Sequence, residues 1–193
     1  MHLLICLVGQ AFYRLLQHGW KMEPLLKRNA PHLQAQSTRY LEQFFGIKTT
    51  ALPRRNGFSV AGVMVLLLLA FALNLLNLLA AVPTPSPPVH ALSFFIPSMV
   101  MLMAIMGSAS HLARGFSSGL SGGYYLFIAL MAVTVGQLVC RYVFLSGPVW
   151  PLWIAFAALA VCRILFNGQH FILFVLYCRT QRYARHAYKN GEW

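Results

Sequence analysis

Acidic residues are almost missing from this chain. Aspartate is absent, and Glu23, Glu42 and Glu192 are the only glutamates among 193 residues. Carboxylates are the usual groups for acid–base catalysis, for hydrolytic metal sites and for proton relays in membranes. Their scarcity argues against these chemistries, so we expect a protein that is not an enzyme.

Charge of either sign is also sparse, and the cysteines lack a metal-binding pattern. Charged residues make up 9% of the chain and hydrophobic residues 59%, whereas about a quarter of the residues of a soluble domain are charged. Cys6, Cys140, Cys162 and Cys178 show no Cys-x-x-Cys spacing. We therefore expect an integral membrane protein with free thiols, no metal site and no cofactor.

Four long apolar stretches dominate what is present. They cover residues 58–82, 91–109, 124–145 and 149–166, the last with a possible extension to 178, and each is long enough to approach or cross a hydrocarbon core of about 30 Å. Pro97 predicts a kink in the second stretch, and the Gly/Ser-rich segment 115–123 predicts a flexible connection to the third.

These stretches predict the fold class. We expect an all-α membrane protein: a bundle of four transmembrane helices with an amphipathic interfacial helix at the N-terminus and a basic helical tail. The predicted organisation is a basic N-terminal region over 1–57, a transmembrane domain over 58–178 and a tail over 179–193.

The basic residues indicate an orientation. Segments 83–90 and 146–148 contain no Lys or Arg, whereas the N-terminal region, the 110–123 segment and the tail all do. Basic residues near the ends of spans favour the cytoplasmic side, so both termini are expected in the cytoplasm, in a bacterial inner membrane. Anionic lipid headgroups are the expected partner of this face, and nucleic acid is not. The candidate lipid-surface residues are Arg14, Arg54, Arg55, Arg114, Arg179, Arg182 and Arg185.

The first residues show helical periodicity. One face of a helix over 1–16 would carry Leu3, Leu4, Leu7, Val8, Ala11, Phe12, Leu15 and Leu16. Such a helix either lies in the membrane interface or packs against the cytoplasmic ends of the bundle. A second short amphipathic helix is expected between Leu33 and Gly46.

Two polar stripes lie inside the apolar stretches. Asn74 and Asn77 share a face of the first span, and Thr134, Gln137 and Arg141 share a face of the third, at a similar depth in the predicted topology. Polar groups in hydrocarbon usually face other helices or a pathway. The stripes therefore serve either interhelical packing, which we favour, or the lining of a pore.

Two further patterns are weaker. Met99, Met103 and Met106 form a thioether stripe of the kind that can pass Cu(I), although methionine is also a common filler of irregular packing. His111 and His170 both fall near cytoplasmic ends of spans and form one loose pair for haem; contacts with headgroups or helix C-termini explain them better.

The functional hypotheses follow from these features. We favour a non-enzymatic membrane protein that acts by protein–protein contact, as an accessory subunit of a membrane complex or a bacterial immunity or exclusion factor. The alternative is a small oligomeric channel or transporter lined by the two polar stripes. A lipid-modifying enzyme is disfavoured because the spans lack carboxylates.

Overall fold

The computed structural model describes residues 8–27, 57–81, 86–144 and 149–189, with the side chains of 25–27, 144 and 184–189 outside that description. Every regular element in these ranges is a helix, which confirms the all-α class. The helices are α2 (Gln10–Lys27), α4 (Phe58–Ala81), α5 (Pro87–Ala113), α6 (Ser117–Phe144), α7 (Trp150–Asn167) and α8 (Gln169–Lys189). The second amphipathic helix, expected between Leu33 and Gly46, lies outside the described residues.

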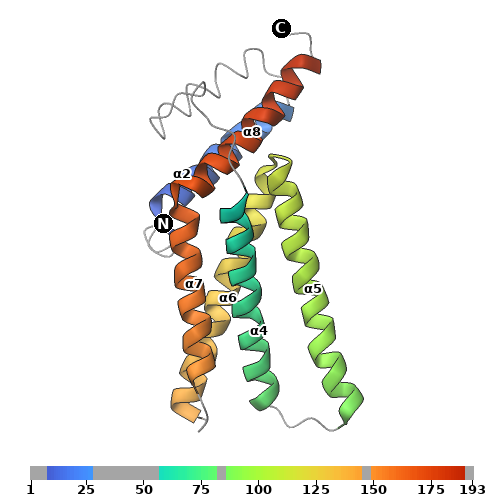
Figure 1. Ribbon diagram of the computed structural model, residues 1–193, viewed down its shortest axis with the longest axis vertical. Helices are drawn as coiled ribbons and strands as arrows, with labels where there is room; N and C mark the ends of the chain where they lie inside the picture. The colour runs from blue at the N-terminus through green and yellow to red at the C-terminus, as the bar shows by residue number, and fades with distance from the viewer. Residues whose placement is uncertain (1–7, 28–56, 82–85, 145–148, 190–193) are drawn as a thin grey trace.

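Four of these helices, α4 to α7, are long and apolar enough to cross a membrane. They run side by side and form the lower part of the molecule in Figure 1. Their apolar side chains favour a hydrocarbon environment over water, and a helix satisfies its own backbone hydrogen bonds there. The chain is therefore a multi-pass membrane protein, as the sequence predicts.

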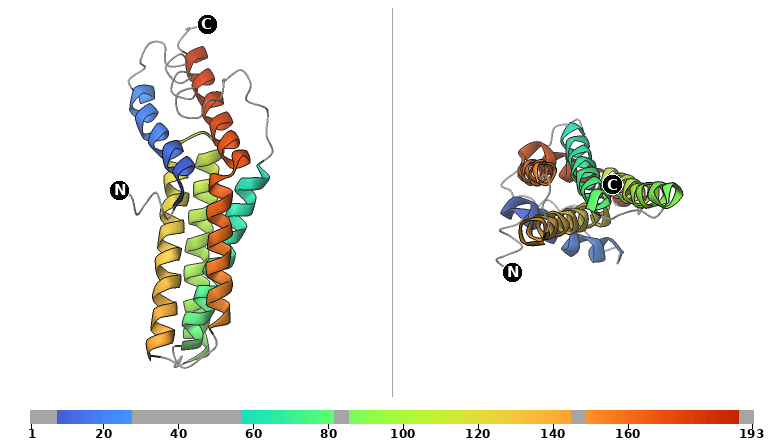
Figure 2. Two further views of the ribbon diagram at one scale, coloured as in Figure 1. Left: turned by 90° about the vertical axis from the view of Figure 1, so that its left-hand side faces the viewer. Right: turned by 90° about the horizontal axis from the view of Figure 1, so that it is seen from below.

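The remaining two described helices lie together at one end of the bundle, which we call the basic end (Figures 1 and 2). Helix α8 is not a continuation of α7. The backbone of Gly168 is extended, with ψ at 141°, so the chain turns there and residues 169–178 belong to a separate helix. The possible extension of the fourth span to 178 is therefore interrupted at Asn167 and Gly168. We call the opposite end of the bundle, where α4 ends and α5 begins, the far end.

Helix α2 uses the predicted apolar face, but over a shifted range. It begins at Gln10, after Gly9 with φ at +99°, and continues to Lys27; residues 1–7 lie outside the described part. Val8, Phe12, Leu15 and Leu16 are all buried. The Phe12 ring lies 4.6 Å from that of Phe166 and 6.1 Å from that of Phe171. The sequence left open whether this helix lies in the membrane interface or packs against the bundle, and the structure shows that it packs against the bundle.

The Gly/Ser-rich segment is a tight turn followed by helix, so the expectation of a flexible connection is wrong. Helix α5 ends at Ala113, and Gly115 follows with φ at +78°. The Gly115 N–H donates to Leu112 O at 2.9 Å, and the Phe116 N–H donates to His111 O at 2.9 Å. These two bonds are a Schellman motif, which satisfies the last carbonyls of the helix. Helix α6 then starts at once, at Ser117.

Glycine in this segment serves close packing. A Cβ atom at Gly119 would overlap the backbone of Leu112 and Ser108 in α5. Only glycine lets the two helices approach this closely, as at small-residue contacts between membrane helices. The composition that suggested flexibility therefore reflects a rigid helix–helix contact.

Helix α5 is longer than expected and the least packed of the four spans. Pro87 and Pro88 open it after the N-cap residue Ser86, and it passes through Pro97. In its most apolar stretch 11% of the residues are buried, against 39% for α4. Towards the far end α5 leans away from α4 and α6 (Figure 1).

Candidate functional site

The two predicted polar stripes face each other between α4 and α6. Asn74 Nδ2 donates to Thr134 Oγ1 at 2.8 Å, and Asn77 Nδ2 donates to Gln137 Oε1 at 2.9 Å. Gln137 Nε2 donates in turn to the Asn74 carbonyl at 3.2 Å. Asn74 and Thr134 are 2% and 0% exposed. Three bonds between neutral side chains and backbone therefore join these spans inside the membrane-crossing region.

Arg141 continues this stripe to the far end. Its Nη2 donates to the Asn77 carbonyl at 3.3 Å, and the residue is 9% exposed. Glu23, the one acidic residue within the described ranges, pairs with Arg182 at the basic end. Arg141 thus has no carboxylate partner among the described residues.

An open groove borders the stripe. Its inner part, of about 300 Å³, lies between α4, α5 and α6 and touches Asn74, Pro97, Met101 and Gln137. Its outer part, of about 260 Å³, runs along α4 and α6 past Gly136 to Arg141. Leu78, Val133 and Gln137 line both parts. The stripe thus has a bonded side between α4 and α6 and an accessible side along this groove.

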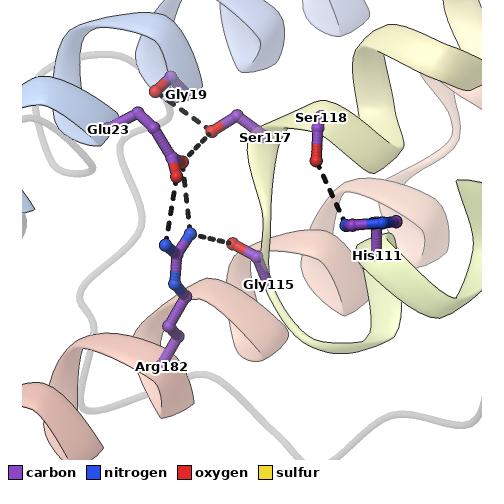
Figure 3. Close-up of polar contacts among 7 residues, drawn as sticks. All are labelled: Gly19, Glu23, His111, Gly115, Ser117, Ser118 and Arg182. Atoms are coloured by element: carbon purple, nitrogen blue, oxygen red, sulfur yellow. Dashed lines mark hydrogen bonds and ion pairs between the residues drawn. The ribbon is translucent and has the colours of Figure 1, made fainter. Parts of the chain in front are cut away.

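A second polar network holds α2 at the basic end (Figure 3). Glu23 of α2 accepts from Arg182 of α8, with Nη2 to Oε1 at 3.0 Å and Nη1 to Oε2 at 3.2 Å. Ser117, the first residue of α6, donates its hydroxyl to Glu23 Oε2 at 2.9 Å. Arg182 also reaches the Gly115 carbonyl and lies 3.8 Å from the centre of the Phe116 ring. One carboxylate therefore connects α2, α6 and α8.

The electrostatics of Glu23 favour its charged form. Burial acts to raise the pKa of this carboxyl, but the hydrogen bonds from Arg182 and Ser117 outweigh it and lower the pKa below its ordinary value. Charge-assisted, two-pronged arginine–carboxylate bonds are among the stronger polar contacts in proteins.

Arg179 is buried deeper in the same interface. It is 2% exposed, and its Nη1 donates to the Leu15 carbonyl at 2.9 Å and lies 3.2 Å from His18 Nδ1. Because guanidinium only donates, His18 accepts through Nδ1 and is neutral. Burial, reinforced by the charges of Arg179 and Lys21, lowers the pKa of His18 to about 3. Glycine at position 19 makes room for the guanidinium, since a Cβ there would lie 2.5 Å from Arg179 Nη2.

Two uncharged side chains complete the attachment of α2. Asn167, at the end of α7, donates to the Val8 carbonyl at 2.7 Å and accepts from the Phe12 N–H at 3.3 Å. Trp20 donates its indole N–H to Ser121 Oγ at 3.3 Å. Helix α2 is thus bonded to α6, α7 and α8.

The predicted lipid-surface residues divide into three groups. Arg14 and Arg114 are exposed. Arg179 and Arg182 instead make the internal contacts just described, so their side chains hold helices together. Arg54 and Arg55 lie outside the described residues, as does the side chain of Arg185.

Sequence reasoning did not identify Glu23, His18, Asn167 or Ser117 as residues that attach α2 to the bundle. The contacts they make join α2 to helices far away in the chain, and no spacing rule connects those positions. A usable signal was the single acid in an otherwise basic amphipathic helix, because a lone carboxylate there requires a cationic partner in the fold.

The weaker candidates are not brought together. His111 Nδ1 lies 3.3 Å from Ser118 Oγ and its ring packs on Phe116, whereas His170 is exposed on α8. Met99, Met103 and Met106 are 64–71% exposed on α5. Within the described ranges, no three His, Cys, Asp or Glu residues are placed to hold a metal ion.

Comparison with known proteins gives this chain no relative: no protein family, curated protein or solved structure matches it.

Proposed function

We propose that this protein acts by contact with another membrane protein and catalyses no reaction. It would serve as an accessory subunit of a membrane complex or as a bacterial immunity or exclusion factor. In this proposal the basic end faces the cytoplasm of a bacterial inner membrane, where Arg14 and Arg114 meet anionic headgroups.

The observation that carries the proposal is the low burial of α5. Over its most apolar stretch it buries 11% of its residues, and Met99 and Met103 are 64% and 71% exposed. A 27-residue span that buries so few of its residues presents most of its surface to the bilayer. Methionine suits such a surface because its unbranched side chain adapts to different partners.

The polar groups of the described chain support the same reading. Asn74, Thr134 and Gln137 make hydrogen bonds between α4 and α6. Arg179 and Arg182 of α8 make hydrogen bonds to α2, the second of them to Glu23. These contacts have structural effects, and none of them requires a substrate.

Purification from the source membrane tests the proposal. In mild detergent the protein should copurify with a second membrane polypeptide in a fixed ratio. A photoreactive residue at Met103 should crosslink to that polypeptide, whereas the same residue at Ile164 of α7, which is 68% exposed, should not. A protein that purifies alone, or crosslinks equally from both positions, would contradict the proposal.

The groove beside the polar stripe favours one alternative, a channel formed by several copies. Gln137 and Arg141 line its outer part, so a ring of chains that enclosed these grooves would place an amide and a cation in an otherwise mainly apolar wall. Such a ring should conduct ions in liposomes, and Arg141→Gln should raise its cation permeability, because an unpaired cation in a pore opposes cations.

A further inference from the structure

We propose that the groove between α4, α5 and α6 binds one anionic phospholipid, with an acyl chain along the groove and the phosphate at Arg141. This site is independent of the contact function proposed above, because it uses the inner side of α5 and the partner surface uses the outer side.

The shape of the groove fits an acyl chain. It extends along α6 from Leu126 to Arg141, which is about 22 Å of helix. One leaflet of a bilayer has a hydrocarbon depth of about 15 Å, so the chain of a leaflet lipid fits lengthwise. The walls are mainly aliphatic and aromatic, with Phe71, Leu75 and Leu130 among them. A volume of about 300 Å³ for the inner part is at the lower end of the range for ligand sites.

The arrangement of the helices leaves this space open. Close contact at Gly119 holds α5 and α6 together at the basic end, and α5 then leans away towards the far end (Figure 1). No side chain of the described residues fills the wedge between them. Dispersion contacts are lost wherever a wall has no neighbouring atoms, and in a bilayer the available filler is a lipid chain.

Charge selects the kind of lipid. Arg141 lies at the outer mouth of the groove with one bond to a backbone carbonyl and no carboxylate partner among the described residues. The residue is 9% exposed, so little water reaches its charge. A guanidinium pairs well with a phosphate through two parallel N–H bonds. A lipid phosphate at the membrane surface would provide that partner at the correct depth.

The test uses the whole protein in dodecyl maltoside, freed of lipid and observed by native mass spectrometry. Dioleoyl phosphatidylglycerol should add one molecule per chain. Dioleoylglycerol, which has the same acyl chains without the phosphate, should bind about tenfold more weakly, as should inorganic phosphate, which has the charge without the chains. Each half of the ligand is thereby tested separately.

Variants then locate the site. Arg141→Gln should weaken phosphatidylglycerol binding about tenfold, and Arg141→Lys should retain most of it. Gly136→Leu should block the outer groove, where the glycine has open space around its Cβ position. The matched controls are Arg114→Gln, an exposed cation at the other end, and Gly107→Leu, an equally open glycine on α5 outside the groove. Both controls should bind as the wild type does.

Three results would overturn the proposal. Equal phosphatidylglycerol binding in all variants would place the lipid elsewhere. If dioleoylglycerol bound as tightly as phosphatidylglycerol, the phosphate would not contribute to binding, and Arg141 would have no role in selecting the lipid. A second polypeptide that crosslinks from Met101 and Val133, inside the groove, would show that a helix occupies the space. The first two results do not bear on a partner crosslinked from Met103, so the two proposals can fail separately.

Discussion

The two ends of the bundle are built in opposite ways. At the basic end α2, α6 and α8 are joined by Glu23, Arg179 and Arg182, and α5 and α6 touch backbone to backbone at Gly119. Towards the far end α4 and α6 are joined mainly by neutral amides and a threonine, with Arg141 at the outermost position, and α5 diverges from them with an open groove beside it.

This difference follows the dielectric environment. Near the membrane surface, water and headgroups lower the cost of ionised groups, so charged pairs can hold an amphipathic helix in place. Deeper in hydrocarbon a charge is costly, and amides with hydroxyls provide interhelical bonds without net charge. The comparison predicts a rigid basic end and a far end that is easier to open.

The largest expected effect is at Gly119. Gly119→Ala places a Cβ against the backbone of α5, where no side chain can move aside, and should destabilise the bundle by about 3 kcal/mol. Unfolding in mixed micelles of dodecyl maltoside and SDS, followed by circular dichroism, measures this. Gly123→Ala, one turn further along α6 with open space around its Cβ, is the matched control and should change little. Equal effects of the two substitutions would mean that the close contact is not what makes this end rigid.

The second-largest expected effect is that the docking of α2 depends on pH, while the rest of the bundle does not. His18 has a folded pKa of about 3, below its ordinary value of 6.5. The unfolded or opened chain therefore binds a proton that the docked chain excludes. Docking of α2 should be strongest above pH 6.5 and weaken as pH falls, by up to about 1.4 kcal/mol per pH unit.

Hydrogen exchange of the α2 amides, corrected for the intrinsic rate, measures this between pH 7 and 5. That window lies above the ordinary pKa of a glutamate, 4.5, so Glu23 contributes little to it. His18→Gln can still accept from Arg179 but does not titrate, and its protection should be independent of pH. The α4 amides should also be insensitive to pH; a parallel change in α4 would show that the whole bundle, and not α2 alone, is opening.

Much of this architecture is readable from the sequence. Runs of apolar residues between proline and glycine signals located the four spans to within several residues, and the spacing of Asn74, Asn77, Thr134 and Gln137 placed them on facing stripes. These features are local or periodic, so a helix of known geometry converts them directly into positions in space.

The features that escaped prediction depend on packing between distant segments. The glycines at 115–123 resemble a linker in composition, and only the α5 backbone against Gly119 shows that they are part of a helix contact. Arg179 looks like one member of a basic tail, yet α2 covers it completely. The partner helix determines which residues of an amphipathic helix become buried. The sequence of α8 alone therefore does not show that α2 covers Arg179.

A smaller effect is expected at the polar stripe. Gln137→Leu removes the bonds to Asn77 and to the Asn74 carbonyl and should lower stability in mixed micelles by roughly 0.6–2 kcal/mol. Asn77→Leu should have a similar effect, and the double variant should cost less than the sum, because both substitutions remove one shared bond. Additive losses would show that the two amides do not act together, and a change in ion flux with unaltered stability would favour the channel.

The smallest effect is expected at the Glu23–Arg182 pair, despite its good geometry. Both side chains are partly exposed, at 25% and 19%, and screening by water and salt limits such pairs to about 0.5–1 kcal/mol. Glu23→Gln, which can still accept from Ser117, should therefore raise hydrogen exchange in α2 only a few fold at pH 7. Salt at about 1 M should bring the wild type towards the variant, since it reduces the screening length to about 3 Å.

Arg182→Gln should have the larger effect, because Arg182 also bonds the Gly115 carbonyl and packs on Phe116. If Glu23→Gln released α2 completely, the charged pair and not the buried apolar face of α2 would be the main attachment, and the stability of the basic end would depend on salt.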